Sequence, residues 1–485
     1  MNPYAQVTAE VDQSRRGRTT AAFFDFDGTL IAGFSVASFM QRRLLEGNMP
    51  PREMLQQFSA ALEYGFGSSD FTATLARSAK SLRNTSEAEL AEAARDVYEK
   101  DLSGNIYPES RALIAAHRAR GHTIVIVSSA TQYQVQHVAA ELGIEHVLCT
   151  ELEVEDGSLT GDIIAPICYG KGKVDAAKQF AAAQGIKLER SFFYTDGGED
   201  IPLLEAVGFP RPLNPDRKLE RRSRQEGWPV QRFESRGFPR LSDVVRTSLV
   251  YSSLTGSFLS GVPAWLLNRS KRDLVNVAVP VWGDFGSAVA GLDVETVGEE
   301  HLWSHRPAVF VFNHQSQTDA LIISRLLRRD FTGVAKTEMK SNPLVGPVLG
   351  AIGTVFIDRS NHDQAINALQ PAVDSLNKGT SIAIAPEGQR SRGYKLGEFK
   401  KGAFHIAMQA GVPVVPIVIQ NSSDSMPKSA VLIRPAKIMV EVLPPVNTDG
   451  WKAETVDEHV AKIRQMFLEK LGQSKNSEVK LRRVK

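Results

Sequence analysis

The hydrophobic pattern of this chain contains two separate series of short apolar runs, and each series alternates with segments of helical period. In the first series, runs of strand length fall within residues 21–30, 123–127, 146–148 and 191–194. Helical spacing follows them at residues 110–121, 132–143, 173–185 and from 201 to 207. Strands that alternate with helices are typical of a parallel sheet covered on both faces. We therefore predict a doubly wound α/β domain.

A long helical region interrupts this first series. Over residues 36–100, apolar side chains recur at helical spacing, as in Met54 with Phe58 and Ala94 with Val97. Residues 47–51 and 65–69 contain Gly, Pro and Ser, which punctuate helices. The pattern predicts a set of helices inserted after the first strand.

The second series begins around residue 270. Its predicted strands are at 308–312, 354–357, 382–385, 414–418 and 437–443. Residues 210–245 are rich in Pro, Arg and Gly without a clear period, which predicts the last strand of the first domain and a linker. The predicted fold class is therefore α/β in two domains. The predicted segments are a disordered N-terminus (1–20), a first domain (21–240), a linker with interfacial helices (241–295), a second domain (296–470) and a basic tail (471–485).

Composition narrows the classes of partner. The chain has 485 residues and a formal net charge of +2, so no overall field attracts a polyanion and we expect no nucleic-acid partner. Residues 217–224 and 475–485 are dense in Lys and Arg, which indicates either solvated surface or contact with anionic lipid headgroups. The two cysteines, Cys149 and Cys168, have no metal-binding spacing and fit a reducing cytoplasm.

No apolar run is long enough for a membrane span, which needs about 18–20 residues. The N-terminus is polar and does not resemble a signal peptide. Residues 258–267 form too short a run, and residues 274–292 contain Pro280 and Asp284. Both segments fit an interfacial or buried helix better than a span.

Two carboxylates directly follow the first predicted strand, in Asp25-Phe-Asp27-Gly28. One carboxylate can act as a nucleophile toward phosphorus and the other as an acid. Phosphoryl transfer also needs a metal ion and a cation or amides around the phosphate. The same half supplies candidate groups at strand ends or helix starts, which are where an open α/β sheet builds its site: Ser128, Lys173, Asp196 and Asp200.

These motifs, in this order, resemble those of the haloacid dehalogenase (HAD) superfamily of phosphatases. The resemblance is to the branch with a helical cap between the first and second motifs, and residues 35–105 correspond to that cap. It implies that Asp25 forms an aspartyl-phosphate. It also implies that Asp27 protonates the leaving alcohol and later activates water.

The same resemblance implies a phosphate site and a metal site. Ser128 would bind the phosphate, and Lys173 would stabilise the charge on Asp25 and the phosphate. The implied cofactor is Mg²⁺, with a metal site formed by Asp25, Asp27 through its backbone carbonyl, Asp196 and, in support, Asp200.

The chain departs from the HAD pattern at two positions. Relatives usually carry Gly-Asp-Ser-x-x-Asp in the fourth motif, whereas here Gly197 takes the place of the serine. Phosphoserine phosphatases of this branch usually carry a glutamate nine residues after the nucleophile, and here that position is Phe34. An apolar residue there argues against phosphoserine and for a lipid-like or uncharged leaving group.

The second half contains His314 and Asp319 in an H-x₄-D spacing just after an apolar strand. A neutral histidine can take the proton of a substrate hydroxyl as it attacks a thioester, while an aspartate fixes the tautomer of the histidine. The next strand ends at Pro386-Glu387-Gly388-Gln-Arg390-Ser, and Arg359 follows another strand. Two arginines near a base suit a substrate with a phosphate monoester.

These blocks resemble the glycerolipid acyltransferases, in particular the 1-acylglycerol-3-phosphate acyltransferases, over about residues 300–445. The resemblance implies that His314 is the general base and Asp319 its partner, with acyl-CoA or acyl-carrier protein as co-substrate. It implies acceptor contacts from Glu387 and Gly388, phosphate contacts from Arg359 and Arg390, a weaker phosphate candidate in Lys336 and a structural role for Pro416. The third block usually reads Phe-Pro-Glu-Gly-Thr-Arg-Ser. Because Ala385 and Gln389 differ here, we expect an altered acceptor shape.

Relatives use an amphipathic helical pair before the catalytic blocks to sit on the bilayer. Residues 248–292 of this chain combine apolar and aromatic side chains with a basic cluster, which suits the membrane interface. The apolar members are Phe258, Leu259, Trp265, Leu266, Leu267, Val281 and Trp282, and the basic ones are Arg269, Lys271 and Arg272. The alternative is a helical pair packed on the core of its own domain.

The sequence thus predicts a bifunctional enzyme of phospholipid synthesis, peripheral (monotopic) on the cytoplasmic face of the membrane. Its second domain would acylate lysophosphatidic acid, and its first would hydrolyse a phosphomonoester with Mg²⁺. Two alternatives change only the first domain, which would then be a regulatory module or act on small phosphates such as phosphoserine. A membrane scaffold without activity is disfavoured by the two sets of acid and base residues.

Overall fold

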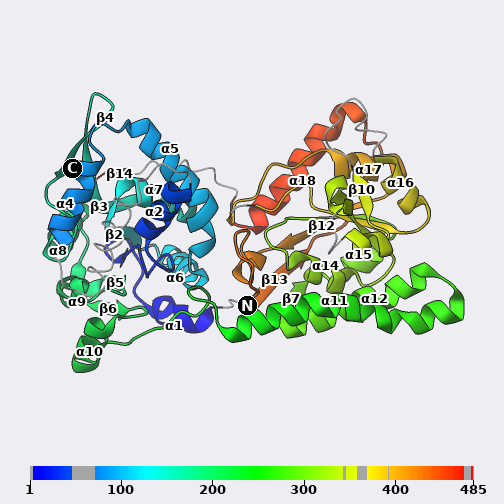
Figure 1. Ribbon diagram of the computed structural model, residues 1–485, viewed down its shortest axis with the longest axis horizontal. Coiled ribbons are helices and arrows are strands. Elements are labelled where there is room, and N and C mark those ends of the chain that lie inside the picture. Colours follow the sequence, from blue (N-terminus) through cyan, green and yellow to red (C-terminus); the bar gives the residue numbers. More distant parts are fainter. Residues whose placement is uncertain are drawn as a thin grey trace. The chain divides into compact units, whose positions relative to one another are not determined.

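The computed structural model describes residues 4–45, 71–341, 346–357, 369–391, 393–473 and 482–483. The chain divides into two compact units, Met1–Phe238 with Ser477–Lys485 and Pro239–Asn476 (Figure 1). Each unit contains one sheet of mostly parallel strands with helices on both faces. The predicted α/β class in two domains is therefore confirmed.

The first unit is built on a sheet with the strand order β14-β3-β2-β1-β5-β6, whose paired strands are parallel. β4 adds an antiparallel partner to β3. The strands are β1 (Ala21–Phe24), β2 (Thr123–Thr131), β3 (His146–Glu155), β4 (Ser158–Ile164), β5 (Phe192–Thr195), β6 (Phe209–Pro212) and β14 (Arg482–Arg483). Because β1 lies between β2 and β5, the carboxyl ends of these three strands meet at one edge.

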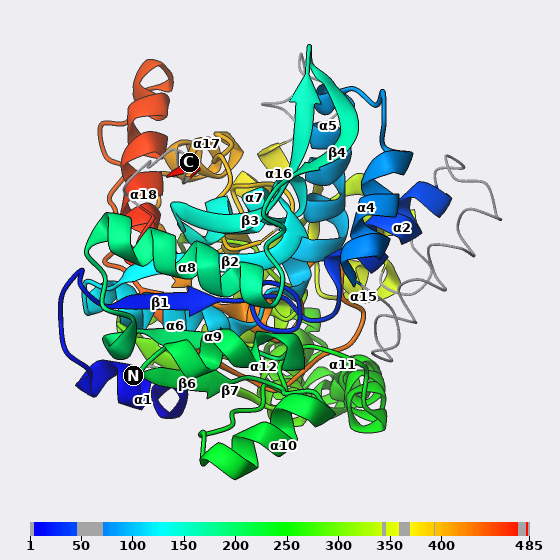
Figure 2. The ribbon, with the colours of Figure 1, turned by 90° about the vertical axis from the view of Figure 1, so that its left-hand side faces the viewer.

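Alternation along the strands of this sheet creates two cores. Phe24 and Tyr194 pack on one face, whereas Phe23 and Phe193 pack on the other, as the two-residue period of a strand requires. The first face carries α1 (Ala5–Gln13), α6 (Pro108–Ala119) and α7 (Gln132–Leu142). The second carries α8 (Lys171–Gln184), α9 (Ile201–Ala206) and α10 (Arg217–Glu226), as can be followed in Figure 2.

Two predictions about the termini of this unit are wrong. The prediction for residues 1–20 is a disordered N-terminus, but in the described part of this segment α1 packs against α6, buries Val11 and pairs Glu10 with Arg211. Residues 210–245 were expected to hold only a strand and a linker, but they contain α10, which Asp216 caps by accepting a hydrogen bond from the Leu219 amide. Both helices are mostly polar, so their sequences lack a strong apolar period.

The described part of the predicted cap is helical. It contains α2 (Ser35–Leu45), α4 (Phe71–Ser81), α5 (Glu87–Val97) and the short turns Tyr98–Leu102 and Ser103–Asn105. The predicted periodicity at Met54 and Phe58 lies outside the described residues. A small core that joins the cap to the β3–β4 hairpin contains Ala79, Ala94, Tyr133, Leu152 and Leu159.

The second unit has the strand order β10-β9-β11-β8-β12-β13-β7. The strands are β7 (Leu292–Val297), β8 (Val309–Phe312), β9 (Phe331–Lys336), β10 (Val355–Ile357), β11 (Ser381–Ile384), β12 (Val414–Ile419) and β13 (Ala436–Val442). β8 to β12 are mutually parallel, whereas β13 is antiparallel to β12 and β7 is parallel to β13. The carboxyl ends of β7 and β13 therefore lie at the edge opposite to those of β8 and β11.

Helices cover both faces of this second sheet. α16 (Gln370–Asn377), α17 (Gly402–Ala410) and α18 (Val456–Lys470) pack on the face that contains Val309 and Val311. α14 (Asp319–Leu327) and the end of α12 (Lys271–Ala290) pack on the face that contains Phe310. The short helices α13 (His301–Ser304) and α15 (Gly346–Ala351) lie in connections.

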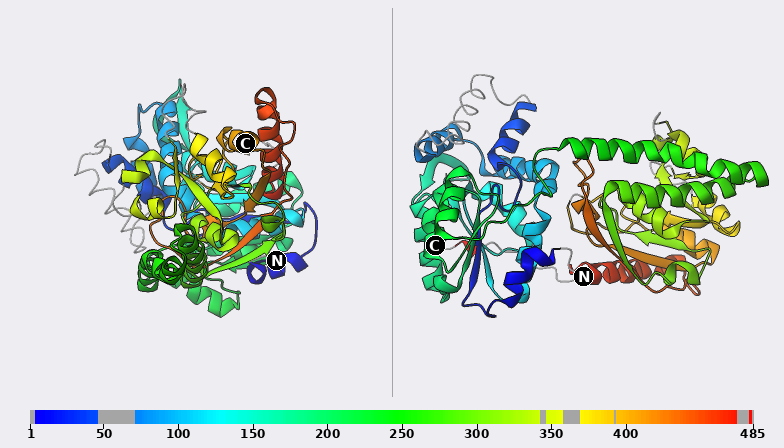
Figure 3. Two further views of the ribbon diagram at one scale, coloured as in Figure 1. Left: turned by 90° about the vertical axis from the view of Figure 1, so that its right-hand side faces the viewer. Right: turned by 90° about the horizontal axis from the view of Figure 1, so that it is seen from below.

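The helices α11 (Leu241–Asn268) and α12 form a long hairpin, visible in green in Figures 1 and 3. Their close approach depends on glycine, because a Cβ on Gly261 would lie 2.4 Å from the carbonyl oxygen of Leu274. α12 approaches α14 in the same way, since a Cβ on Gly283 would lie 2.5 Å from the Arg325 nitrogen. Among the described residues, no helix combines the length and apolar character that a membrane crossing requires.

Candidate active sites

The first site begins at the end of β1, where Asp25 leaves the strand. Its amide still donates to the carbonyl of Tyr194 on β5 at 2.9 Å, which holds the start of the loop on the sheet. Lys173, the third residue of α8, bridges two carboxylates: its Nζ lies 2.9 Å from Asp25 Oδ1 and 2.8 Å from Asp200 Oδ2. Thr195 also donates to Asp200 Oδ2 at 2.7 Å. The sheet edge therefore joins three of the predicted residues in one network.

The charges in this network are almost completely buried. Asp25, Lys173 and Asp200 are 6%, 1% and 0% exposed. Burial raises the pKa of Asp25, and the ammonium of Lys173 offsets part of that rise. Burial opposes the charge on Lys173, but the carboxylates of Asp200 and Asp25 outweigh it and hold its pKa above the ordinary value. A buried lysine that stays charged beside a carboxylate can stabilise a phosphoryl group on that carboxylate.

Asp27 is held by one residue, Ser35, at the start of α2. The Ser35 amide donates to Asp27 Oδ1 at 2.7 Å and its hydroxyl donates to Oδ2 at 3.1 Å. Burial raises the pKa of Asp27 to about 7, against the lowering effect of the Ser35 amide. A carboxyl group with a pKa near neutrality can both give and take a proton at physiological pH.

Asp196 lies against the loop that carries Asp25 and Asp27. A Cβ on Gly28 would lie 2.0 Å from Asp196 Oδ2, and Gly28 has a φ of +69°, so this close approach requires glycine. Burial, followed by the charges of Asp25, Glu199 and Asp200, raises the pKa of Asp196 well above its ordinary value. Several carboxylates crowd around one lysine, which is the electrostatic setting that a divalent cation relieves.

The donor set fits Mg²⁺, which prefers oxygen ligands and is often held by only one or two carboxylates with water completing its shell. Lys173 binds one carboxylate oxygen of Asp25, and Ser35 binds both side-chain oxygens of Asp27. Asp25 and Asp196 would therefore supply the carboxylate ligands, and Asp27 would supply its backbone carbonyl. Asp200 Oδ1 is buried and has no hydrogen-bond partner within the described ranges. Within the described part of the chain, no three side chains of His, Cys, Asp or Glu converge in a metal-binding arrangement.

Ser128 lies on β2, the strand next to β1, at the same edge as Asp25. It is 2% exposed, and its Oγ accepts a hydrogen bond from the Ala130 amide at 3.1 Å. Phe34, nine residues after Asp25, is 56% exposed. It therefore contributes an apolar surface close to Ser35 and Asp27.

Glu199 and Gln134 also belong to this first site, although neither is among the residues predicted from the sequence. The Glu199 carboxylate folds over Gly197, since a Cβ there would lie 2.5 Å from Glu199 Oε1. Its charge raises the pKa values of Asp25 and Asp196. Glu199 stands inside the fourth motif, so its position was a usable signal. Gln134 hydrogen-bonds to Ser35 across 99 residues of sequence, and no local pattern marks that contact.

The second site follows β8. His314 Nδ1 lies 2.8 Å from Asp319 Oδ2, the first residue of α14. The same oxygen accepts hydrogen bonds from the amides of Gln315 and Ser316, each at 2.9 Å. Because a carboxylate that accepts these bonds has no proton to donate, His314 carries its proton on Nδ1 and presents a free lone pair on Nε2. The His314 side chain is 30% exposed and Asp319 is 0% exposed, so the base is accessible and its partner is fixed.

Glu387 braces the loop that carries His314. Its Oε1 accepts the His314 amide and its Oε2 accepts the Gly397 amide, both at 2.8 Å. Burial raises the pKa of Glu387, while these two amides lower it. Both carboxylate oxygens of Glu387 therefore accept hydrogen bonds from backbone amides. The predicted contact of Glu387 with the acceptor stays a prediction.

The motif at residues 385–391 contacts the loop of His314 through a backbone hydrogen bond. The Ser391 amide donates to the His314 carbonyl at 2.8 Å, which places the neighbouring Arg390 beside the His314 loop. Arg390 Nη1 is buried and has no hydrogen-bond partner among the described residues. Gly388 has a φ of +75°, which favours glycine in the turn before Arg390. Arg359 and the side chain of Lys336 lie outside the described structure.

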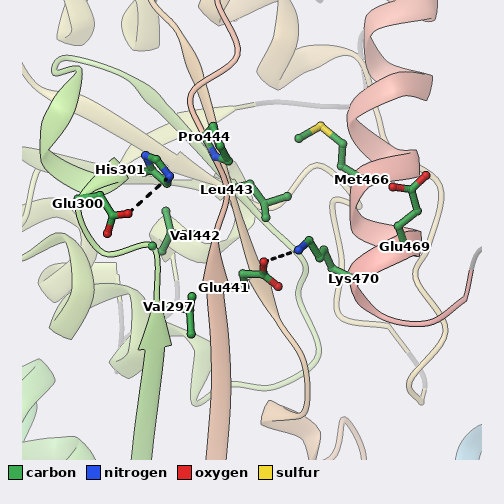
Figure 4. A pocket seen from close by; sticks show the side chains of 11 residues that line it. Val297, Glu300, His301, Glu441, Val442, Leu443, Pro444, Met466, Glu469 and Lys470 are labelled. Atoms are coloured by element: carbon green, nitrogen blue, oxygen red, sulfur yellow. Dashed lines mark hydrogen bonds and ion pairs between the residues drawn. The ribbon is translucent and has the colours of Figure 1, made fainter. Parts of the chain in front are cut away.

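A pocket of about 380 Å³ lies elsewhere in the second unit (Figure 4). It opens at the carboxyl ends of β7 and β13, which is the sheet edge opposite to His314. Charged groups in its lining pair with one another, Glu441 with Lys470 and Glu300 with His301. None of the residues predicted for catalysis lines it.

Comparison with known proteins matches the two halves separately. The model of the haloacid dehalogenase-like hydrolases matches residues 22–205, and that of the acyltransferases matches residues 293–420. A probable phosphatase of Mycobacterium tuberculosis is 35% identical over 218 residues, which are 44% of this chain and 75% of that protein. The 1-acyl-sn-glycerol-3-phosphate acyltransferase of Saccharomyces cerevisiae is 33% identical over 234 residues, 47% of this chain and 77% of that enzyme.

The chain belongs to both families. Its first half is a haloacid dehalogenase-like domain of the phosphatase type, and its second half is a domain of the 1-acylglycerol-3-phosphate acyltransferases. A crystal structure of the acyltransferase PlsC from Thermotoga maritima is 22% identical, with a TM-score of 0.39, and covers 48% of this chain and 98% of that one. Both resemblances drawn from the motifs are therefore confirmed, and the protein is an enzyme with a phosphatase domain and an acyltransferase domain.

Proposed function

We propose that this protein is a bifunctional enzyme of phospholipid synthesis. Its acyltransferase domain would transfer an acyl group from acyl-CoA or acyl-carrier protein to lysophosphatidic acid, which gives phosphatidic acid. Its phosphatase domain would hydrolyse a phosphomonoester with Mg²⁺ through an aspartyl-phosphate. The observation that carries the first half of the proposal is the histidine whose Nδ1 is bound to Asp319 while Nε2 is left for a substrate.

Acyl transfer needs no covalent intermediate on the protein. As the hydroxyl of the acceptor attacks the thioester carbonyl, His314 Nε2 takes the hydroxyl proton, and the new positive charge faces the buried carboxylate of Asp319. The carbon–sulfur bond then breaks, and His314 returns the proton to the leaving thiol. Arg390 supplies a buried donor for the acceptor phosphate. Since Glu387 holds the His314 amide, it keeps the base in place during the transfer.

Phosphate hydrolysis would use a nucleophile that belongs to the chain. A carboxylate oxygen of Asp25 forms a bond to phosphorus while the bond between phosphorus and the alcohol oxygen breaks. Asp27 gives its proton to the oxygen of the leaving alcohol. Asp27 then takes a proton from the water that attacks the phosphorus of the aspartyl-phosphate. The bond between phosphorus and the Asp25 oxygen breaks, which releases phosphate and restores the Asp25 carboxylate. When bound, Mg²⁺ would neutralise charge between the phosphate and the carboxylates of Asp25 and Asp196.

We also propose that the α11–α12 hairpin lies at the membrane interface, on the cytoplasmic face. Several large apolar side chains of the hairpin are exposed to solvent, which supports this placement: Leu241, Leu249, Leu259, Leu266, Leu267, Val281 and Phe285. Arg269 stacks on Trp265 beside them, whereas Arg272 pairs with Asp330 of its own domain. Tyr251 of α11 donates to Gln317 of the His314 loop at 2.6 Å, so the hairpin touches the catalytic loop.

The test is to incubate the purified protein with labelled lysophosphatidic acid, acyl-CoA and Mg²⁺ and to resolve the lipid products. We expect the wild-type protein to form phosphatidic acid and the His314→Ala variant to form none. We expect phosphate release to vanish with Asp25→Asn while acyl transfer continues. His305→Ala and Asp162→Asn, at exposed positions of the same domains, are the matched controls.

Each outcome decides a separate part of the proposal. Failure of the wild type to acylate lysophosphatidic acid would disprove that acceptor. Phosphate release that survives Asp25→Asn would disprove the aspartyl-phosphate mechanism. If a panel of lipid phosphates and phosphoserine yields no phosphate at all, the first domain is a regulatory module.

A further inference from the structure

Asp27, which is both the acid and the base of the phosphatase domain, is held by a chain of hydrogen bonds that has no part in the mechanism proposed above. Both carboxylate oxygens of Asp27 are bound by Ser35, and the Ser35 hydroxyl in turn accepts a hydrogen bond from Gln134 Nε2 at 3.0 Å. Ser35 is 0% and Gln134 is 8% exposed, so water does not compete for these contacts. The chain connects the loop after β1 to the first turn of α7.

The orientation of the Gln134 amide is fixed by its other partner. Gln134 Oε1 accepts hydrogen bonds from the amide of Thr131 at 2.8 Å and from its hydroxyl at 2.9 Å. A backbone amide can only donate, so the atom that faces Thr131 must be the oxygen, and the atom that faces Ser35 must be the nitrogen. Thr131 caps α7 and follows the β2 segment that contains Ser128.

The amide in turn fixes the direction of the Ser35 hydroxyl. Because Gln134 Nε2 donates to Ser35 Oγ, the single proton of the hydroxyl is free to point at Asp27 Oδ2. The Ser35 amide holds the other oxygen, so the plane of the Asp27 carboxyl group is set by two donors from one residue. A buried and fully connected network of this kind permits a single orientation.

We infer that Ser35 and Gln134 are positioning residues, which aim the Asp27 carboxyl group at the leaving oxygen of the phosphate ester. The inference rests on the proposed phosphatase activity and adds residues that the motifs do not contain. Its chemical consequence depends on the leaving group. An alkyl alcohol leaves poorly unless Asp27 protonates its oxygen as the bond to phosphorus breaks, whereas p-nitrophenolate leaves as a stable anion with little need of a proton.

The decisive variant is Gln134→Glu. It keeps an oxygen for the Thr131 amide and so preserves the cap of α7. Toward Ser35 it replaces a donor by an acceptor, which draws the Ser35 hydroxyl proton away from Asp27. Ser35→Ala removes the same hydroxyl directly and keeps the backbone bond to Asp27 Oδ1. Gln132→Ala is the matched control, because Gln132 lies on the same helix and binds the Leu152 amide instead.

The experiment measures kcat/KM, which reports the steps up to release of the alcohol, with p-nitrophenyl phosphate and with three alkyl esters. The alkyl esters are lysophosphatidic acid, glycerol 3-phosphate and phosphoserine. For the alkyl ester that wild type hydrolyses, we expect both variants to lower kcat/KM by about 10- to 100-fold, part of the roughly 10²–10⁴-fold that a general acid supplies. With p-nitrophenyl phosphate we expect a loss below about 3-fold, since that leaving group needs little acid.

A double variant sharpens the result. If both single substitutions act through the same hydroxyl proton, Ser35→Ala combined with Gln134→Glu is no worse than either alone. Circular dichroism and the thermal midpoint of each variant show whether the domain stays folded. Gln132→Ala is expected to keep the wild-type ratio of alkyl to aryl kcat/KM.

Equal losses on aryl and alkyl esters, or no loss in either variant, would overturn the positioning role while the phosphatase stands. A wild-type protein that hydrolyses only the aryl ester would also overturn the positioning role, because proton transfer from Asp27 would then contribute nothing to the reaction. Wild type that hydrolyses none of the four esters disproves the proposed phosphatase itself, and this inference with it.

Discussion

The two domains place their chemistry at the same location in similar folds, yet they surround it with opposite environments. In the phosphatase domain, Asp25, Lys173 and Asp200 follow or flank the central strands, and each is at most 6% exposed. In the acyltransferase domain, His314 follows β8 with 30% of its side chain exposed and one buried partner, Asp319. The first site is dense in buried charge, whereas the second consists of one accessible base.

The origin of the nucleophile explains this difference. A phosphatase that attacks through its own aspartate must keep a charged carboxylate out of water and balance it, so it needs a buried lysine and a metal ion. An acyltransferase receives its nucleophile with the substrate and needs only a base that the substrate can reach. We therefore predict that changes to the buried charges of the phosphatase site destabilise its domain. Changes to the acyltransferase site should abolish activity while that domain stays folded.

The largest expected effect is on the base of the acyltransferase. Asp319→Asn should lower acyl transfer by about three orders of magnitude, because the asparagine no longer selects the Nδ1 tautomer or faces the imidazolium with a charge. Phosphate release and the unfolding temperature should stay close to wild type. Rates of both reactions on one preparation, with Asp293→Asn at an exposed position of β7 as control, provide the measurement. A parallel loss of phosphate release would contradict the independence of the two sites.

The next effect is on stability. Lys173→Met should destabilise the phosphatase domain by about 3–5 kcal/mol, because it leaves the buried carboxylates of Asp25 and Asp200 without their cation. Adding Asp200→Asn should recover part of this loss. Urea unfolding of the full chain, compared with Lys178→Met at an exposed position of the same helix, tests it. If Lys173→Met is as stable as the control variant, the ion pairs of Lys173 with Asp25 and Asp200 contribute no net stabilisation.

The smallest expected effect concerns a buried histidine pair behind the phosphatase sheet. His117 and His122 share a hydrogen bond between their Nδ1 atoms at 2.8 Å, and His117 also contacts the Tyr194 hydroxyl at 2.9 Å. Burial lowers the pKa of both, so the unfolded chain takes up protons near pH 6.5 that the folded pair refuses. The contribution of this histidine pair to the stability of the domain is therefore full above pH 6.5 and falls as the pH decreases, by at most about 1.4 kcal/mol per pH unit for each histidine.

Calorimetry of the full chain between pH 7 and pH 5 tests this sign. His122→Asn, which removes one of the two titrating groups, should reduce the pH dependence of the free energy of unfolding. A variant with the same slope as wild type would show that the pair does not account for the loss.

The sequence predicted best where a strand and its catalytic residue are neighbours in the chain. Asp25 and Asp27 after β1 and His314 after β8 stand where their motifs placed them, because the end of a parallel strand is itself a local feature. The prediction failed where helices are polar, as for α1 and α10, and it missed the edge strand β7. These elements are placed by contacts with distant segments, such as the ion pair between Glu10 of α1 and Arg211 of β6.

By itself the sequence determined the two families, the order of the domains and the residue types that carry each reaction, since these are properties of short motifs and of apolar period. The tertiary structure decided how those residues are held. Gln134 reaches Asp27 through Ser35 across 99 residues of chain, and Glu387 supports the His314 amide from 73 residues away. Hydrogen bonds of this kind depend on direction and on exclusion of water, which only the packing of distant segments provides.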